Sequence, residues 1–223
     1  MNVRRFLTKN GLSVAMLLLF LGSIAGQAAS GFRVANDEAR EHHEAPIGFG
    51  DYLRSGDFIE SVFENWESEF LQMAVFVLLT KYLRQKGSSE SKGFEGSEEV
   101  DEDPRKKRRD PNAPWPVRKG GVILALYQRS LSIALMLLFG LSFVLHGLGG
   151  ASKHNEDQLR HGGEMISALA YIGTAQFWFE SFQNWQSEFL SVAILVLLSI
   201  VLRERGSPQS KPVAAPHSET GEG

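Results

Sequence analysis

Four apolar runs separated by polar segments dominate the chain, at about residues 12–29, 63–83, 131–148 and 180–202. A helix of about 20 mostly apolar residues is long enough to cross the hydrocarbon core of a bilayer. The run from Phe70 to Leu83 has only 14 residues, so the second helix has to begin near residue 63, within a polar and aromatic collar. The pattern predicts an all-α integral membrane protein with four transmembrane helices.

The second and fourth apolar runs share one sequence pattern. FENWESEFLQMAVFVLLTKYLR covers residues 63–84 and FQNWQSEFLSVAILVLLSIVLR covers residues 182–203. Shifting the chain by 119 positions aligns residues 11–92 with the second half without a gap, and more than a third of the aligned pairs are identical. Such self-similarity indicates an internal repeat. We therefore expect two repeats, 1–92 and 122–211, with two transmembrane helices each.

The first apolar run has an alternative interpretation. Arg4, Arg5 and Lys9 precede it and small residues end it, as in a cleaved secretory signal peptide. Its counterpart in the second repeat, residues 131–148, lies in the middle of the chain, where a signal peptide has no place. We therefore expect residues 12–29 to be a retained transmembrane helix.

The segments between and after the repeats are polar. Residues 93–121 join an acidic block to the basic block Arg105–Arg109, and we expect them to be a solvated, disordered linker. The basic block has an alternative partner in anionic lipid headgroups, whereas nucleic acid is not expected because no aromatic platform accompanies the block. Residues 122–128 are expected to form a short interfacial helix, and residues 212–223 a disordered tail.

Lysine and arginine are unevenly distributed along the chain. The termini and the linker through Arg129 carry 18 of the 23, and the loops within the two repeats carry five. Cytoplasmic segments of membrane proteins are enriched in these residues. We therefore expect both termini and the linker in the cytoplasm and both loops outside. Because each repeat has an even number of spans, the two repeats are expected to be parallel.

Each collar contains an acidic residue at the same place. Asn65 and Glu69 are four residues apart and share a helix face, as do Asn184 and Glu188. Ionisable groups inside a membrane are costly and often functional, so the two carboxylates are candidates for a proton or cation path. In the alternative interpretation the collars lie at headgroup depth, where the carboxylates reach water. These four residues form the candidate polar collar.

The loops within the repeats place histidine at helical spacing from a carboxylate. Glu38 and His42 are four residues apart, as are Asp157 and His161, and such pairs can bind a divalent metal. Neither pair specifies a third ligand, so we expect solvated loop residues and no metal site. The sequence contains no cysteine. It also contains no P-loop, Rossmann or nucleophile-elbow motif, so we expect no cofactor, no catalytic residue and no enzyme activity.

Three features together resemble an uncharacterised bacterial family of small duplicated membrane proteins, a domain of unknown function. They are the repeated N-W-x-S-E-F collar, the DPNAPWPVRKGG joint, and the endings GSSESK at Gly87–Lys92 and GSPQSK at Gly206–Lys211. The resemblance covers nearly the whole chain. It implies a bacterial integral membrane protein, for which we expect the cytoplasmic (inner) membrane, and it brings no activity, cofactor or site residue.

The function expected from these features is that of a non-enzymatic membrane protein of interaction or envelope-support type. The alternative is a small transporter or channel, with the membrane-edge carboxylates on a proton or cation path. A transporter of this size is expected to be a homo-oligomer, because four spans rarely enclose a solvated path. The lipid bilayer is the expected partner under both hypotheses, and the sequence specifies no protein partner.

Overall fold

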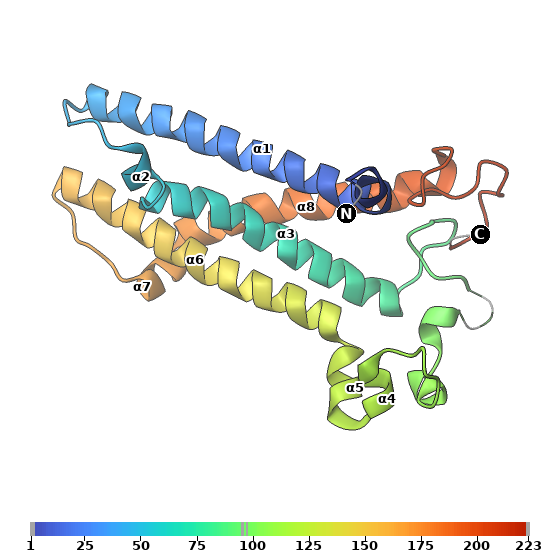
Figure 1. Cartoon of the computed structure of the whole chain (residues 1–223). Coiled ribbons are helices and arrows are strands. Elements are labelled where there is room, and N and C mark those ends of the chain that lie inside the picture. The colour runs from blue at the N-terminus through green and yellow to red at the C-terminus, as the bar shows by residue number, and fades with distance from the viewer. Residues whose placement is uncertain (1–2, 95, 97, 222–223) are drawn as a thin grey trace. The chain divides into compact units, whose positions relative to one another are not determined.

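The protein is described here by a computed structural model, which covers residues 3–94, 96 and 98–221. Over these residues the chain forms four long helices (Figure 1): α1 (Val3–Glu41), α3 (Gly56–Tyr82), α6 (Ser130–His161) and α8 (Ala175–Val201). The shorter elements are α2 (Phe49–Tyr52), η1 (Glu99–Asp101), η2 (Pro104–Lys107), α4 (Trp115–Lys119), α5 (Gly121–Tyr127) and α7 (Ala168–Ile172). The described part of the chain contains no strand, which confirms the all-α fold class.

Three of the long helices in the described part of the chain, α1, α6 and α8, are long and apolar enough to cross a membrane. Only 6% of the apolar window of α8 is buried inside the protein, and leucines such as Leu18, Leu137 and Leu197 are exposed. Apolar surface on this scale suits a lipid environment, and it indicates a membrane protein. α3 is not among the three helices, because acidic residues occupy its first half, and its crossing of the membrane stays a prediction.

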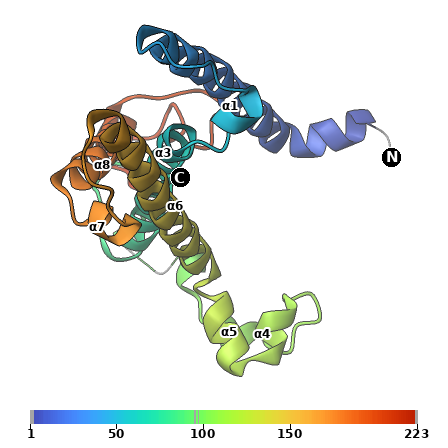
Figure 2. The same cartoon turned by 90° about the vertical axis from the view of Figure 1, so that its left-hand side faces the viewer.

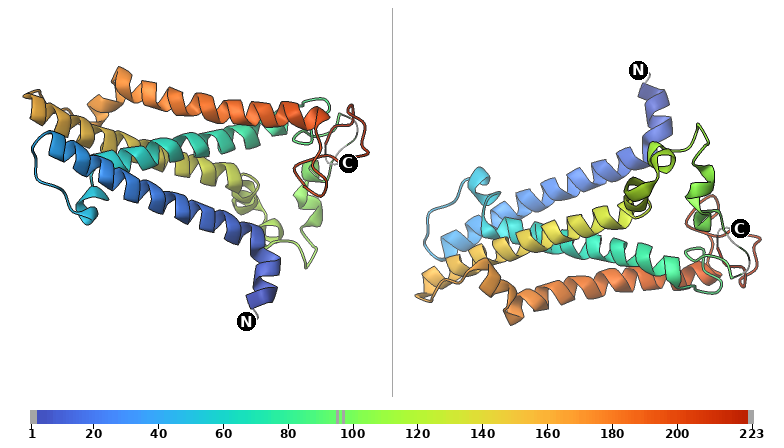
Figure 3. Two further views of the ribbon diagram at one scale, coloured as in Figure 1. Left: turned by 90° about the horizontal axis from the view of Figure 1, so that it is seen from above. Right: turned by 90° about the horizontal axis from the view of Figure 1, so that it is seen from below.

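Two helices continue well beyond the apolar runs that predict them. α1 extends to Glu41 and α6 to His161, so the expectation of loops directly after residues 29 and 148 was wrong. Alanine, glutamate and arginine in these polar extensions are good helix formers, and the backbone hydrogen bonding continues where the hydrophobic run stops. α1 also bends near its start (Figure 3), where Asn10 has non-helical angles of φ −128° and ψ 17°.

The chain divides into two compact units, each of which combines segments from both halves of the sequence. Unit 1 consists of Met1–Val62 and Leu145–Tyr171, and unit 2 of Phe63–Val144 and Ile172–Gly223. Residues of α3 and α6 therefore contribute to both units.

In unit 1, the start of α3 approaches the second half of α6 at glycines. A Cβ atom added to Gly149 would lie 2.5 Å from the backbone nitrogen of Glu60, and one added to Gly56 would meet the backbone of α6. Only glycine allows two helix backbones to come this close. Gly22 and Gly26 have the GxxxG spacing typical of such contacts, but a Cβ atom added to either would meet nothing within 4 Å among the described residues.

The segments that follow α1 and α6 in unit 1 are closed by the same pair of side-chain hydrogen bonds. Asn36 Oδ1 accepts from Ile47 N at 2.9 Å, and Asn36 Nδ2 donates to Ile47 O at 3.4 Å. Asn155 makes the same two bonds with Ile166, at 2.8 and 2.9 Å. The two asparagines are 119 residues apart, and so are the two isoleucines. This is the offset at which the sequence aligns with itself.

In unit 2, the GSSESK and GSPQSK segments form turns that also share their hydrogen bonds. Ser91 Oγ accepts from Gln85 N, and Ser210 Oγ accepts from Glu204 N, both at 2.9 Å. Gly87 and Gly206 have φ angles of 86° and 89°, in the left-handed region that favours glycine. These equivalent motifs therefore adopt equivalent local structures.

The C-terminal tail has a defined path as far as Gly221. Lys211 is 2% exposed, and its ammonium group donates to the carbonyl oxygens of Pro216, His217 and Glu219 at 3.3, 3.2 and 2.7 Å. Gly221 N donates to Ser88 O at 3.0 Å. The expectation of a disordered tail, which was based on amino-acid composition, was therefore wrong for the described residues up to Gly221. Composition contains no information about the hydrogen bonds by which one lysine satisfies three backbone acceptors.

The glycine contact in unit 1 predicts a clear difference between two substitutions in α6. Gly149→Ala places a methyl group against the backbone of Glu60, so we expect it to lower the free energy of unfolding by about 1 to 3 kcal/mol. Gly140→Ala is the matched control, because a Cβ there meets nothing within 4 Å in the described part of the chain. Thermal unfolding in detergent measures both variants. Equal melting temperatures would contradict the close packing.

Candidate functional site: the buried carboxylates of α3

The first half of α3 carries four glutamates, at positions 60, 64, 67 and 69. Two of them are buried: Glu60 is 3% exposed and Glu67 is fully buried, whereas Glu69 is exposed. Residues seven apart are separated by almost two helical turns, so Glu60 and Glu67 lie on the same face of α3. Buried ionisable groups in a membrane protein mark a candidate functional site.

Glu60 is held in unit 1 by partners on α6 and α7. Lys153 Nζ lies 2.6 Å from Glu60 Oε2, and the Tyr171 hydroxyl donates to Glu60 Oε1 at 3.1 Å. Lys153 Nζ also lies 3.2 Å from a carboxylate oxygen of Asp57. Both oxygens of the buried carboxylate therefore have a partner. These contacts offset the free energy lost when Glu60 is removed from water.

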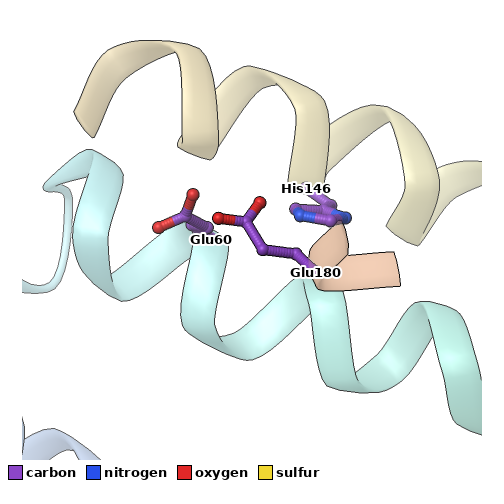
Figure 4. Close-up of side chains that lie close together, drawn as sticks. All are labelled: Glu60, His146 and Glu180. Atoms are coloured by element: carbon purple, nitrogen blue, oxygen red, sulfur yellow. The ribbon is translucent and has the colours of Figure 1, made fainter. Parts of the chain in front are cut away.

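His146 lies next to Glu60 in the same unit. Figure 4 shows Glu60 on α3 and His146 on α6, and their potential ligand atoms lie within 4.8 Å of one another. His146 is fully buried. A neighbouring carboxylate and imidazole can exchange a proton, and each is a metal ligand by type. Glu180, also drawn in Figure 4, belongs to α8 in unit 2, where it accepts a hydrogen bond from Gln176 Nε2 at 2.6 Å.

An open cavity of about 380 Å³ lies beside this network in unit 1. Both of the carboxylate and histidine pairs noted in the sequence contribute to its lining, together with the ion pair of Arg160 and Glu44 at 3.1 Å. Among the described residues, neither of these carboxylate and histidine pairs belongs to a group of three potential metal ligands whose ligand atoms lie within 4.8 Å of one another. The full charged lining is Glu38, His42, Glu44, Asp57, Lys153, Glu156, Asp157, Arg160 and His161.

Tyr52 forms part of the wall of the same cavity and is 2% exposed. Burial raises the pKa of the Tyr52 phenol, because the charged phenolate is disfavoured away from water. The negative charge of Asp57 raises this pKa further, and the positive charge of Lys153 opposes the change. The cavity wall therefore keeps Tyr52 neutral over a wider pH range than a tyrosine in water.

In unit 2, the fully buried Glu67 is paired with a tryptophan of the second collar. Trp185 Nε1 donates to Glu67 Oε1 at 3.1 Å. Sequence reasoning missed Glu67, because its aligned partner in the second repeat is Gln186 and no carboxylate recurs there. The spacing of Glu60, Glu64 and Glu67 could have identified Glu67 from the sequence, because it places three acidic residues on one face of an apolar helix.

The four residues of the candidate polar collar lie in unit 2. Asn65 and Glu69 are exposed, and Asn184 and Glu188 are half-buried. Asn184 donates to the backbone oxygen of Glu180 at 3.1 Å, within α8. Glu69 and Glu188 are close enough to interact electrostatically. The structure therefore brings the two collar carboxylates near each other but buries neither of them fully.

Serine hydroxyls are also buried in unit 2. Ser68, Ser142 and Ser181 are exposed by 2%, 2% and 0%. Ser68 donates to the backbone oxygen of Asn65 at 2.7 Å. Ser181 Oγ has no hydrogen-bond partner among the described residues. A buried hydroxyl of this kind can be satisfied by water or by an ion.

One family match covers nearly the whole chain. Residues 3–222 match the domain of unknown function DUF6766. The chain belongs to the DUF6766 family. The expected resemblance to an uncharacterised family is thereby confirmed, and the family description assigns no activity to its members. No curated protein and no solved structure matches this DUF6766 protein.

A double-mutant cycle measures the buried ion pair of the DUF6766 protein. Glu60 and Lys153 have side-chain exposures of 4% and 44%, so solvent screens the pair in part. We expect the substitutions Glu60→Gln and Lys153→Met to be coupled by about 1 to 3 kcal/mol in unfolding experiments in detergent.

The matched control for this cycle is Asp57→Asn. The Asp57 side chain is 47% exposed in its contact with Lys153, so its loss should change stability by less than about 1 kcal/mol. Strictly additive effects of Glu60→Gln and Lys153→Met would show that the pair makes no net contribution.

Proposed function

We propose that the protein spans a bacterial cytoplasmic membrane four times, as two parallel repeats, with both termini in the cytoplasm. α1, α6 and α8 have the length and apolar character of spans. α3 has 27 residues, which correspond to about 40 Å of helix, enough to cross a bilayer. The repeat arrangement is supported by the equivalent asparagine bonds of unit 1 and the equivalent serine turns of unit 2.

We further propose that the protein moves protons or small cations across this membrane and has no enzyme activity. The observation that carries this proposal is the burial of Glu60 and Glu67 on one face of α3. An ionisable group is retained inside a membrane at a free-energy cost, and proton and ion pathways are its common use. Within unit 1, the imidazole of His146 beside Glu60 adds a site that a proton or cation can occupy. Within unit 2, the hydroxyl of Ser181, which has no partner among the described residues, adds a site for water or an ion.

A second function, interaction or envelope support without transport, is favoured by a different observation. Both oxygens of Glu60 have partners, Lys153 and Tyr171. A carboxylate that is fully paired in this way can have a purely structural role, in which it holds helices together. Under this alternative, the buried charges stabilise the fold and the polar segments contact partners. The two functions differ in whether the membrane-embedded protein conducts.

Flux measurements on protein reconstituted in vesicles separate the two functions. With an imposed pH or potassium gradient, we expect the parent protein to conduct and Glu67→Gln to fall to the level of empty vesicles, because the buried proton or cation site is lost. Glu69→Gln is the matched control, since it makes the same change two residues away at an exposed position. If the path runs through the buried Glu67 and not through the collar, Glu69→Gln conducts like the parent, whereas a loss of conduction in Glu69→Gln alone would assign the path to the collar.

One result would contradict transport itself, and a second would contradict the role of Glu67. Parent protein that conducts under no gradient would favour the support function instead. Conduction by Glu67→Gln at the parent rate would remove Glu67 from the path. Circular dichroism and gel filtration of each variant show whether it is folded, so that a loss of conduction is not confused with a loss of structure.

Cysteine labelling tests the orientation and the crossing by α3, because the native chain has no cysteine. We expect a membrane-impermeant maleimide to label Glu41→Cys in intact cells and to leave Asn112→Cys unlabelled until the cells are opened. Both positions are exposed, and α3 is the only long helix between them in the described part of the chain. The reverse pattern would invert the orientation. Labelling of both positions would mean that α3 does not cross.

A further inference from the structure

We propose that the basic segment of the linker binds the phosphate groups of anionic lipids at the membrane surface. Two independent features of unit 2 lead to this assignment. One is a hollow whose described lining is entirely cationic, and the other is a group of exposed apolar side chains on the adjoining short helices. The proposal does not depend on the transport function.

The hollow has a volume of about 570 Å³. Among the described residues, its lining consists of five cationic side chains from η2, the turn that follows η2, and α4: Arg105, Lys106, Arg108, Arg109 and Arg118. Like charges gathered in this way repel each other unless an anion lies between them. The planar guanidinium group forms paired hydrogen bonds with phosphate, so a site with four arginines is suited to one or more phosphate groups.

Specific backbone contacts build this hollow. Arg108 donates from Nε to Arg118 O and from Nη2 to Lys119 O, both at 3.4 Å. These bonds hold the basic turn against the end of α4 and bring Arg118 to residues about ten positions earlier in the chain. Lys107 belongs to the same basic block, but it pairs with Glu102 at 3.2 Å and is not part of the described lining.

The adjoining helices expose apolar side chains. α4 packs against both η2 and α5, and Figure 2 shows α4 and α5 side by side. The exposed fractions are 59% for Trp115, 75% for Val122, 57% for Leu126 and 45% for Tyr127. Tryptophan and tyrosine favour the headgroup region, and a short helix with an exposed apolar surface lies in the membrane interface.

The connection to a candidate span decides between lipid phosphate and free phosphate. α5 ends at Tyr127 and α6, one of the candidate spans, begins at Ser130. The apolar residues of α4 and α5 are therefore tethered to the point where the chain enters the membrane. Charge at this depth meets the phosphate groups of lipids first, and anionic lipids attract basic segments by about 1 kcal/mol per cationic residue.

Native mass spectrometry of the full chain in detergent micelles tests the proposal, with phosphatidylglycerol or phosphatidylcholine added as probe. We expect phosphatidylglycerol to be retained more tightly. The double substitution Arg105→Gln and Arg109→Gln should weaken this retention by at least about fivefold without changing that of phosphatidylcholine. Lys107→Gln is the matched control, because it removes one charge from the same block outside the hollow. It should retain phosphatidylglycerol like the parent.

Each of three results would overturn the proposal. Equal retention of the two lipids would show no preference for an anionic headgroup. An equal loss of retention in Lys107→Gln and in the single substitution Arg105→Gln would reveal general charge attraction without a specific site. Calorimetry on protein in phosphatidylcholine nanodiscs measures the binding of a free anion, inorganic phosphate or pyrophosphate. Tighter binding of inorganic phosphate or pyrophosphate than of phosphatidylglycerol would assign the hollow to a soluble ligand.

Discussion

A carboxylate buried among helices in a low-dielectric environment needs a partner, and the packing of unit 1 depends on providing one for Glu60. Lys153 and Tyr171 supply the contacts. They can reach Glu60 because glycines, Gly149 among them, let α3 and α6 approach backbone to backbone. The glycine contact and the ion pair are thus parts of one arrangement. A side chain at the glycine would separate the helices, and the carboxylate would then lose the lysine.

The two halves of the sequence share local hydrogen bonds in their loops and turns, but they differ in their buried charged residues. The asparagine bonds and the serine turns occur at both places related by the 119-residue offset. Glu60, Glu67 and Lys153 do not recur, because their aligned positions hold Phe179, Gln186 and Val34. Local hydrogen bonds fix loops and turns in either half, whereas the buried carboxylates occur only once each, Glu60 in unit 1 and Glu67 in unit 2. The similarity between the two halves is therefore one of local hydrogen bonds, and it does not extend to the buried ionisable groups.

The linker illustrates how charge acquires specificity through local structure. Its basic block is attracted to anionic lipids by charge alone. The bonds from Arg108 to the end of α4 turn part of that block into a hollow, while Lys107 pairs with an acidic neighbour. The exposed apolar residues of α4 and α5 lie next to the hollow, and α5 directly precedes α6, a candidate span. Electrostatic attraction and apolar insertion therefore act on the same short segment.

The sequence by itself determined the helical class, three of its four predicted spans as membrane-crossing candidates, and membership of the DUF6766 family. These properties depend on hydrophobic runs and motifs, which are local in the chain. It did not reveal that Glu60 pairs with Lys153 or that Glu67 is buried against Trp185, nor where α1 and α6 end. Partners about 93 and 118 residues apart meet only through helix packing, and burial is decided by which helix faces which neighbour. Tertiary structure alone therefore selected the buried carboxylates over the repeated ones of the collar.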